Sequence, residues 1–167
     1  MTFTITSPAF PHEGDMPIEF TCDGNDLAPP LVWSGAPTGS QSLALVVDDP
    51  DAPDPAAPSH IWVHWVLYNL PPDSAGIAQG AAYLPKGTRE GRNDWRRVGY
   101  RGPCPPAGRH RYVFHLYALD AVLSDLRHPT KQALFAAMQG HVLGEAVLVG
   151  TYMRRTNRGH SSSAGAT

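Results

Sequence analysis

Residues 43–53 read Leu43-Ala44-Leu45-Val46-Val47-Asp48-Asp49-Pro50-Asp51-Ala52-Pro53. Five apolar residues in a row are typical of a strand that is buried on both faces. Three carboxylates follow at its end, and because prolines restrict the backbone there, we expect a rigid turn. Carboxylates held this close together repel one another unless a cation or a hydrogen-bond donor lies nearby. The segment therefore predicts a buried strand that ends in a polar site.

The partners of these carboxylates are expected downstream. His64 lies within an apolar run, and Gly108-Arg109-His110-Arg111-Tyr112 opens another. Together with Asp49 they predict a small pocket of Asp and His side chains. Aspartate often accepts local backbone N–H groups in turns, so we expect Asp51 to support the turn rather than the pocket. Supporting positions at the same place are Pro53 and Arg111.

Length and composition limit the class of protein. The chain has 167 residues, 42% of them hydrophobic, with 17 Pro and 16 Gly, which indicates a globular domain rich in turns. A formal net charge of −2 argues against a nucleic-acid partner, because such a partner needs a clustered basic face. No apolar run approaches the roughly 20 residues of a membrane span, and the first residues lack a signal-peptide pattern. We therefore expect a cytoplasmic protein without stable membrane insertion.

Short apolar segments between Pro- and Gly-rich turns predict a mainly β protein. Strands are expected at residues 18–21, 31–33, 42–48, 61–69, 111–119 and 145–153. One helix is expected over residues 131–138, with Thr130 as its N-cap, and residues 71–109 form a long irregular excursion. The predicted fold is an antiparallel β-sandwich with one or two short helices, forming a single domain over residues 1–153. Residues 154–167 are expected to be a disordered tail.

The two cysteines, Cys22 and Cys104, are expected to be free thiols. A disulfide between them would stabilise the fold by roughly 4 to 5 kcal/mol in the chain-entropy model. A reducing cytosol nevertheless keeps such bonds open. Cys104 lies in a stiff, proline-rich loop and would be a reactive thiol if a histidine lay beside it. The simpler interpretation is that both are partly buried small apolar residues.

Histidine spacing gives no metal site. His60 and His64 lie four residues apart, which in a strand is about 13 Å, too far for one shared ion. His110 and His115 point to opposite faces of one strand. The Gly-x-Ser-x-Gly motif of a nucleophilic serine is also missing from the sequence. We therefore expect no metal, no cofactor and no catalytic residue, and paired carboxylates or an Asp/His pair stay as the catalytic alternatives.

Four ordered motifs carry a family resemblance: Asp49-Pro50-Asp51-Ala52-Pro53, His64-Trp65-Val66-Leu67-Tyr68-Asn69-Leu70-Pro71, Gly99-Tyr100-Arg101-Gly102-Pro103-Cys104-Pro105-Pro106 and His110-Arg111-Tyr112-Val113-Phe114. In this order they resemble the phosphatidylethanolamine-binding protein family, and most of all its bacterial, Raf-kinase-inhibitor-like branch. The likeness covers nearly the whole chain, from Phe3 to Tyr152.

The resemblance implies a β-sandwich with a small cavity at one end that takes phosphate-type head groups. It places Asp49, His64 and His110 in the polar lining, with Tyr112 close behind. It also makes Gly102-Pro103-Cys104 part of the cavity wall. A carboxylate beside imidazoles favours their protonated form, which donates charge-assisted hydrogen bonds to an anion.

The predicted function is therefore that of a non-catalytic binding protein for a small phosphorylated or other anionic ligand, which regulates a partner enzyme. One alternative is an inhibitor of a kinase or a protease that acts through its surface. Another is a hydrolase that uses an Asp/His pair. Kinase inhibition belongs to some relatives and does not follow from shared motifs. Exposed apolar residues on an edge strand would support a homodimer. The ligand itself is not identified by the sequence.

Overall fold

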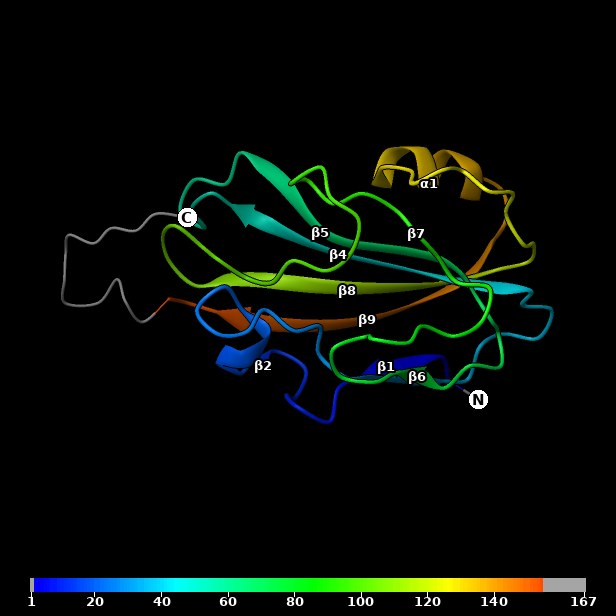
Figure 1. Ribbon diagram of the computed structural model, residues 1–167, viewed down its shortest axis with the longest axis horizontal. Helices are drawn as coiled ribbons and strands as arrows, with labels where there is room; N and C mark the ends of the chain where they lie inside the picture. Colours follow the sequence, from blue (N-terminus) through cyan, green and yellow to red (C-terminus); the bar gives the residue numbers. More distant parts are fainter. Residues whose placement is uncertain (1, 155–167) are drawn as a thin grey trace.

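The computed structural model describes residues 2–154 and is built from three layers (Figure 1). A six-stranded sheet forms the middle layer, a three-stranded sheet covers one face, and helix α1 covers part of the other. The large sheet has the order β2 (Gly14–Asp15), β9 (Val142–Tyr152), β8 (His110–Leu119), β4 (Ser42–Ala52), β5 (His60–Leu70) and β7 (Arg89–Glu90). The small sheet has the order β1 (Thr4–Thr6), β3 (Leu31–Ser34) and β6 (Gly76–Ile77). The mainly β sandwich is confirmed.

Strand β4 is buried on both faces, as its continuous apolar run predicts. Leu43, Leu45 and Val47 belong to the core between the two sheets. Ala44 and Val46 belong to a second core between the large sheet and α1. Because side chains alternate along a strand, the two carboxylates that follow are directed to different layers. This alternation separates Asp48 from Asp49.

Helix α1 (Lys131–Met138) is held to the sheet by its own apolar face and by Asp48. Thr130 is the N-cap, and its side chain accepts a hydrogen bond from the backbone N–H of Ala133 at 3.1 Å. Leu134 and Met138 are buried against the sheet. The ammonium group of Lys131 lies 2.7 Å from Asp48 Oδ2. Both the helix and its cap agree with the sequence prediction.

A β-bulge in β5 turns His64 toward the inside of the sandwich. Val47 pairs with Trp65, but its neighbour Asp48 pairs with Val63, so His64 is the extra residue between them. A bulge of this kind places two successive side chains on the same side of a strand. His64 therefore faces the same layer as Trp65, whereas regular alternation would have turned it toward α1.

Residues 18–21, which we expected to form a strand, instead contain the 3₁₀ helix η1 (Ile18–Phe20). Pro17 precedes it with φ near −59°, and its carbonyl accepts the N–H of Phe20 at 3.1 Å. Within η1 only Phe20 is buried, in the core, while Ile18 is about half exposed. A proline at the start and a single buried anchor favour one helical turn over a strand.

Two further predictions concern the long connection over residues 71–109 and the residues that follow β9. Residues 71–109 are largely irregular, interrupted only by the two-residue strands β6 and β7. Arg154, the first residue of the predicted tail, is well placed, and its Nη2 donates to Asp23 Oδ1 at 2.8 Å. The rest of that tail, residues 155–167, lies outside the described residues. Among residues 2–154, no helix has the length and apolar character needed to cross a membrane.

Candidate functional site

A cavity of about 320 Å³ opens at one end of the sandwich, where β4 ends and β5 and β8 begin. This is the left end in Figure 1, where the loops that follow β4 and precede β8 lie. Three strands and three connecting segments supply its walls, and the side chains are a mixture of aromatic rings, carboxylates and prolines. The lining residues are Cys22, Asp26, Asp49, Ala52, Pro53, His60, Trp62, His64, Trp95, Arg101, Gly102, Cys104, Pro105, Pro106 and Tyr112.

Asp49 lies on the cavity wall and is paired with His110 directly behind it. His110 Nδ1 is 2.5 Å from Asp49 Oδ2, and His110 Nε2 is 2.8 Å from the carbonyl oxygen of Ala107. Both partners are acceptors, so the ring donates from both nitrogens and is the imidazolium form. Burial alone would lower the pKa of His110, but the hydrogen bond to Asp49 and its charge outweigh burial and raise that pKa. Sequence reasoning placed His110 in the lining, whereas its completely buried ring lies one layer deeper, with no free nitrogen.

Asp51 has the supporting role that the sequence predicts, through a different partner. Its Oδ2 accepts the backbone N–H of Arg111 at 2.8 Å and the guanidinium Nε at 3.0 Å, and Oδ1 accepts Nη2 at 2.8 Å. This ion pair joins the end of β4 to β8 and lowers the pKa of Asp51. The local backbone bond that we expected of Asp51 is made by Asp49, whose Oδ1 accepts the N–H of Asp51 at 2.7 Å.

His64 lines the cavity, and only one of its two ring nitrogens has a hydrogen-bond partner within residues 2–154. Its Nδ1 lies 2.6 Å from the carbonyl oxygen of Arg101. A carbonyl can only accept, so Nδ1 carries the hydrogen and Nε2 is unprotonated when the ring is neutral. Burial lowers the pKa of His64, and the Arg101 carbonyl and the charge of Asp49 offset this only in part. Nε2 is therefore an acceptor at neutral pH and becomes a charged donor in acid.

Tyr112 brings a buried hydroxyl to the cavity that has no hydrogen-bond partner within residues 2–154. Its ring packs edge to face against His64, with the centroids 5.2 Å apart, and lies nearly parallel to His110. Burial, with the charge of Asp49, raises the pKa of Tyr112 far above its usual range, so the hydroxyl stays protonated. A buried donor without a partner costs about 1 to 3 kcal/mol, and a ligand oxygen in the cavity would remove that cost.

Sequence reasoning missed three prominent residues of the lining: Trp62, Trp95 and Arg101. The indoles of Trp62 and Trp95 meet edge to face at 5.5 Å, and the Arg101 guanidinium lies 5.1 Å from the centre of the Trp95 ring. Trp62 precedes His64 by two residues, so strand alternation could have placed it on the same wall. Trp95 and Arg101 come from the irregular excursion, where no periodic pattern signals orientation.

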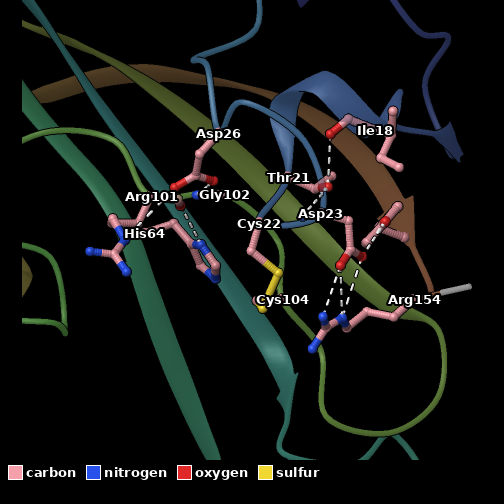
Figure 2. Close-up of a disulfide and its surroundings, with 11 residues drawn as sticks. Ile18, Thr21, Cys22, Asp23, Asp26, His64, Arg101, Gly102, Cys104 and Arg154 are labelled. Atoms are coloured by element: carbon pink, nitrogen blue, oxygen red, sulfur yellow. Dashed lines mark hydrogen bonds and ion pairs between the residues drawn. A yellow bond between two sulfur atoms is a disulfide. The ribbon is translucent and has the colours of Figure 1, made fainter. Parts of the chain in front are cut away.

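The expectation of two free thiols is wrong, because Cys22 and Cys104 form a disulfide in the cavity wall. Figure 2 shows this bond joining the turn after η1 to the loop before β8. Asp26 makes a second link between the same segments, since its Oδ1 accepts the N–H of Gly102 at 2.9 Å. Free thiols were expected only because a reducing compartment was assumed. The sequence separation of 82 gives no sign that the two cysteines are close in space. Only the fold shows that they meet.

The other predicted wall and support residues lie at the cavity. Gly102 and Pro53 line it, as does Cys104 through the disulfide. Pro103 is buried behind the wall, and its carbonyl accepts the backbone N–H of Cys22 at 3.0 Å. Within the described part of the chain, no group of three or more His, Cys, Asp or Glu side chains is arranged to hold a metal ion.

These features define a β-sandwich protein with a small, partly aromatic cavity at one end. The sequence model of the family described as "Phosphatidylethanolamine-binding protein" matches residues 6–153, so the chain belongs to that family. A "UPF0098 protein" of Methanothermobacter thermautotrophicus is 51% identical over 153 residues, which cover 90% of this chain and 98% of the relative. A similar protein of Chlamydia trachomatis is 42% identical over 148 residues, 89% of this chain and 97% of the relative.

Solved structures agree with this assignment. The crystal structure of a phosphatidylethanolamine-binding protein homolog, CT736 from Chlamydia trachomatis, is similar with a TM-score of 0.85 and 40% identity, covering 92% of this chain and 98% of that one. Escherichia coli YbcL, described as a new member of the mammalian family, is similar with a TM-score of 0.82 and 27% identity, covering 93% of this chain and 100% of that one.

Proposed function

We propose that this protein is a non-catalytic binding protein whose cavity takes a small ligand through an anionic, phosphate-type group. The observation that carries the proposal is the buried Tyr112 hydroxyl: Tyr112 lines the cavity, and this donor has no partner in the described residues. Anionic oxygens are the strongest acceptors for such a donor. The Arg101 guanidinium on the same wall supplies a positive charge.

Binding is favoured over hydrolysis by the state of His110. A general base needs a nitrogen lone pair within reach of the proton that it removes. Both His110 nitrogens already donate, to Asp49 and to the carbonyl of Ala107, so the predicted Asp/His pair has no free base. A turnover screen with phosphoesters and peptides tests the hydrolase alternative directly.

We also propose that the protein regulates a partner kinase or protease, that it forms a homodimer and that it is cytoplasmic. A pull-down with wild-type protein and a cavity variant tests the partner, and sedimentation tests the dimer. Cell fractionation with trapping of free thiols tests the location. That experiment matters because exposed disulfides persist mainly in oxidising compartments.

The Tyr112→Phe variant is expected to lose affinity for inorganic phosphate without losing stability. The hydroxyl has no hydrogen-bond partner among residues 2–154, so its removal relieves a buried unsatisfied group. In the complex, one hydrogen bond to a charged acceptor is lost, and we expect about tenfold weaker binding. Phosphate titrations followed by NMR, together with urea denaturation, measure both quantities.

Tyr152→Phe is the matched control for this experiment. The Tyr152 hydroxyl donates to Asp23 Oδ2 at 2.6 Å and lies outside the cavity lining. This variant should therefore lose stability and keep its phosphate affinity. Unchanged phosphate affinity in Tyr112→Phe would contradict the role given to that hydroxyl.

Affinity for a dianion of constant charge should increase in acid. Sulfate is a suitable probe because, unlike phosphate, it does not titrate in this range. The pKa of His64 is lowered by burial, so the ring is neutral near pH 8 and gains its charge only below the usual imidazole value of about 6.5. Sulfate should therefore bind more tightly near pH 5 than near pH 8. His64→Gln should abolish this difference, and an equal difference in that variant would assign the titration to another group.

A further inference from the structure

The Cys22–Cys104 disulfide lies where a solvent thiol and the cavity ligand could both reach it. Cys22 is exposed and Cys104 is only partly buried, although both line the cavity. Reduction of a disulfide requires that a thiolate reach one of its sulfurs, so exposure decides whether the folded protein can react. Most side chains of the hydrophobic core are almost completely buried, whereas Cys22 and Cys104 are not.

Several non-covalent links connect the same two segments as the disulfide, and Figure 2 shows those that Asp26 makes with Gly102 and Arg101. Besides the bonds from Cys22 N–H to Pro103 and from Gly102 N–H to Asp26, the Tyr100 hydroxyl donates to the carbonyl of Phe20 at 2.8 Å. Arg101 Nε also lies 3.8 Å from Asp26 Oδ2. These contacts would keep the segments together after reduction, so the reduced protein can stay folded with a looser wall.

The wall segment that the disulfide holds also contains Arg101, whose backbone carbonyl accepts the hydrogen bond of His64. Arg101 precedes Cys104 by three residues, with Pro103 between them stiffening the segment. The carbonyl of Arg101 fixes the tautomer of His64, and its guanidinium packs on Trp95. A shift of Cys104 would therefore reach both His64 and Arg101.

We propose that the Cys22–Cys104 pair is a redox site that controls ligand binding: a dithiol reductant opens it in the folded protein, and the loosened wall weakens binding of the anionic group. This inference rests on the proposed function for its ligand. The disulfide would then both stabilise the fold and control the ligand site.

The chemistry is thiol–disulfide exchange. A thiolate of the reductant attacks the sulfur of Cys22, the more exposed residue of the pair. The sulfur–sulfur bond breaks, and Cys104 leaves as a thiolate that takes up a proton. The second thiol of the reductant, as a thiolate, then attacks the reductant's other sulfur, which is bound to Cys22 in the mixed disulfide. Cys22 leaves as a thiolate and takes up a proton. Two electrons and two protons pass from the dithiol to the cysteine pair, and the reductant is oxidised to its cyclic disulfide.

The test compares oxidised protein with protein treated with dithiothreitol, both under native conditions. Thiol alkylation with mass spectrometry measures reduction, and NMR measures two further quantities: the ¹⁵N shifts of His64, which report its tautomer, and the affinity for inorganic phosphate. We expect reduction without unfolding, a smaller fraction of the Nδ1–H tautomer of His64, and phosphate binding about tenfold weaker, as for one lost charged hydrogen bond. The Cys22→Ser/Cys104→Ser variant is the matched control and should behave like reduced protein with or without dithiothreitol.

Two results would overturn the inference. One is reduction that occurs only together with global unfolding. The other is folded, reduced protein with unchanged His64 shifts and unchanged phosphate affinity. If oxidised protein binds no phosphate at all, the proposed function fails, and the His64 tautomer still decides whether the disulfide controls the wall. The wild-type measurement does not depend on the double variant being able to fold.

Discussion

We expect the Cys22→Ser/Cys104→Ser variant to lose about 4 kcal/mol of unfolding free energy relative to the oxidised protein. The bond closes a loop across 82 residues of sequence separation, and a longer loop removes more entropy from the unfolded chain. The packed volume changes little, because serine is close in size to cysteine. The hydrogen bonds from Cys22 N–H to Pro103 and from Gly102 N–H to Asp26 still join the two segments. Urea denaturation of both proteins, without reductant, measures the difference.

Each single variant should lose nearly as much stability as the double variant, since either substitution breaks the same bond. Wild-type protein unfolded in dithiothreitol is the control and should match the variants. A loss below about 1 kcal/mol would show that the unfolded chain gains little freedom when the link is removed. The same free energy opposes reduction of the folded protein, so a dithiol should open the bond where a simple monothiol does not.

Asp49→Asn is expected to cost about 3 to 5 kcal/mol of stability near pH 6, because it leaves the buried His110 charge without a partner. Both side chains are buried, with His110 Nδ1 2.5 Å from Asp49 Oδ2. Without the Asp49 carboxylate the raised pKa of His110 should fall, so the ring should lose its proton at a lower pH. NMR titration of the ring and urea denaturation at several pH values measure the two effects.

The loss in Asp49→Asn should shrink as pH rises. A histidine with a raised folded pKa contributes stability that is fully present below the unfolded imidazole value of about 6.5 and is lost as pH rises through the folded pKa. His115, whose pKa is also raised, titrates alike in both proteins and cancels in the difference. A loss that stays constant from about pH 6 to pH 9 would contradict the charged state assigned to His110.

Asp51→Asn is the matched control for that experiment. Its carboxylate lies two residues away on the same strand and pairs with Arg111, whose side chain is 59% exposed. Asp51 itself is buried, but the partner that the substitution leaves behind is a largely exposed guanidinium that water can solvate, so this variant should be less damaging than Asp49→Asn. The comparison separates the cost of leaving a buried charge without its partner from that of leaving an exposed charge at the same strand end.

Much of the fold could be predicted because its signals are local. Strand β4 follows from an uninterrupted apolar run, and α1 follows from Thr130 as N-cap with Leu134 and Met138 four residues apart. The failure at residues 18–21 is also instructive. Four residues are too few for alternation to distinguish a strand from the single helical turn that Pro17 begins.

The site could be predicted in position but not in detail. The carboxylates after β4 and His64 mark the cavity, because polar residues at the end of a buried strand need partners. Their roles depend on geometry that spacing does not encode. A bulge of one residue turns His64 inward, and the carbonyl of Ala107 engages the second nitrogen of His110. Arg101 and Trp95 come from a segment without periodicity, so their approach to the cavity has no sequence signal.

By itself the sequence determined that this is a mainly β protein with a polar site at the end of β4, because burial patterns and proline restrictions act between neighbours in the chain. Tertiary structure alone decided that Cys22 meets Cys104, that His110 lies behind Asp49, and that the hydroxyl of Tyr112 is left without a partner in the described residues. The physical reason is that these features depend on contacts between segments far apart in the chain. The pairing of β4 with β8 brings Asp49 to His110, and the packing of two loops at the cavity end brings Cys22 to Cys104.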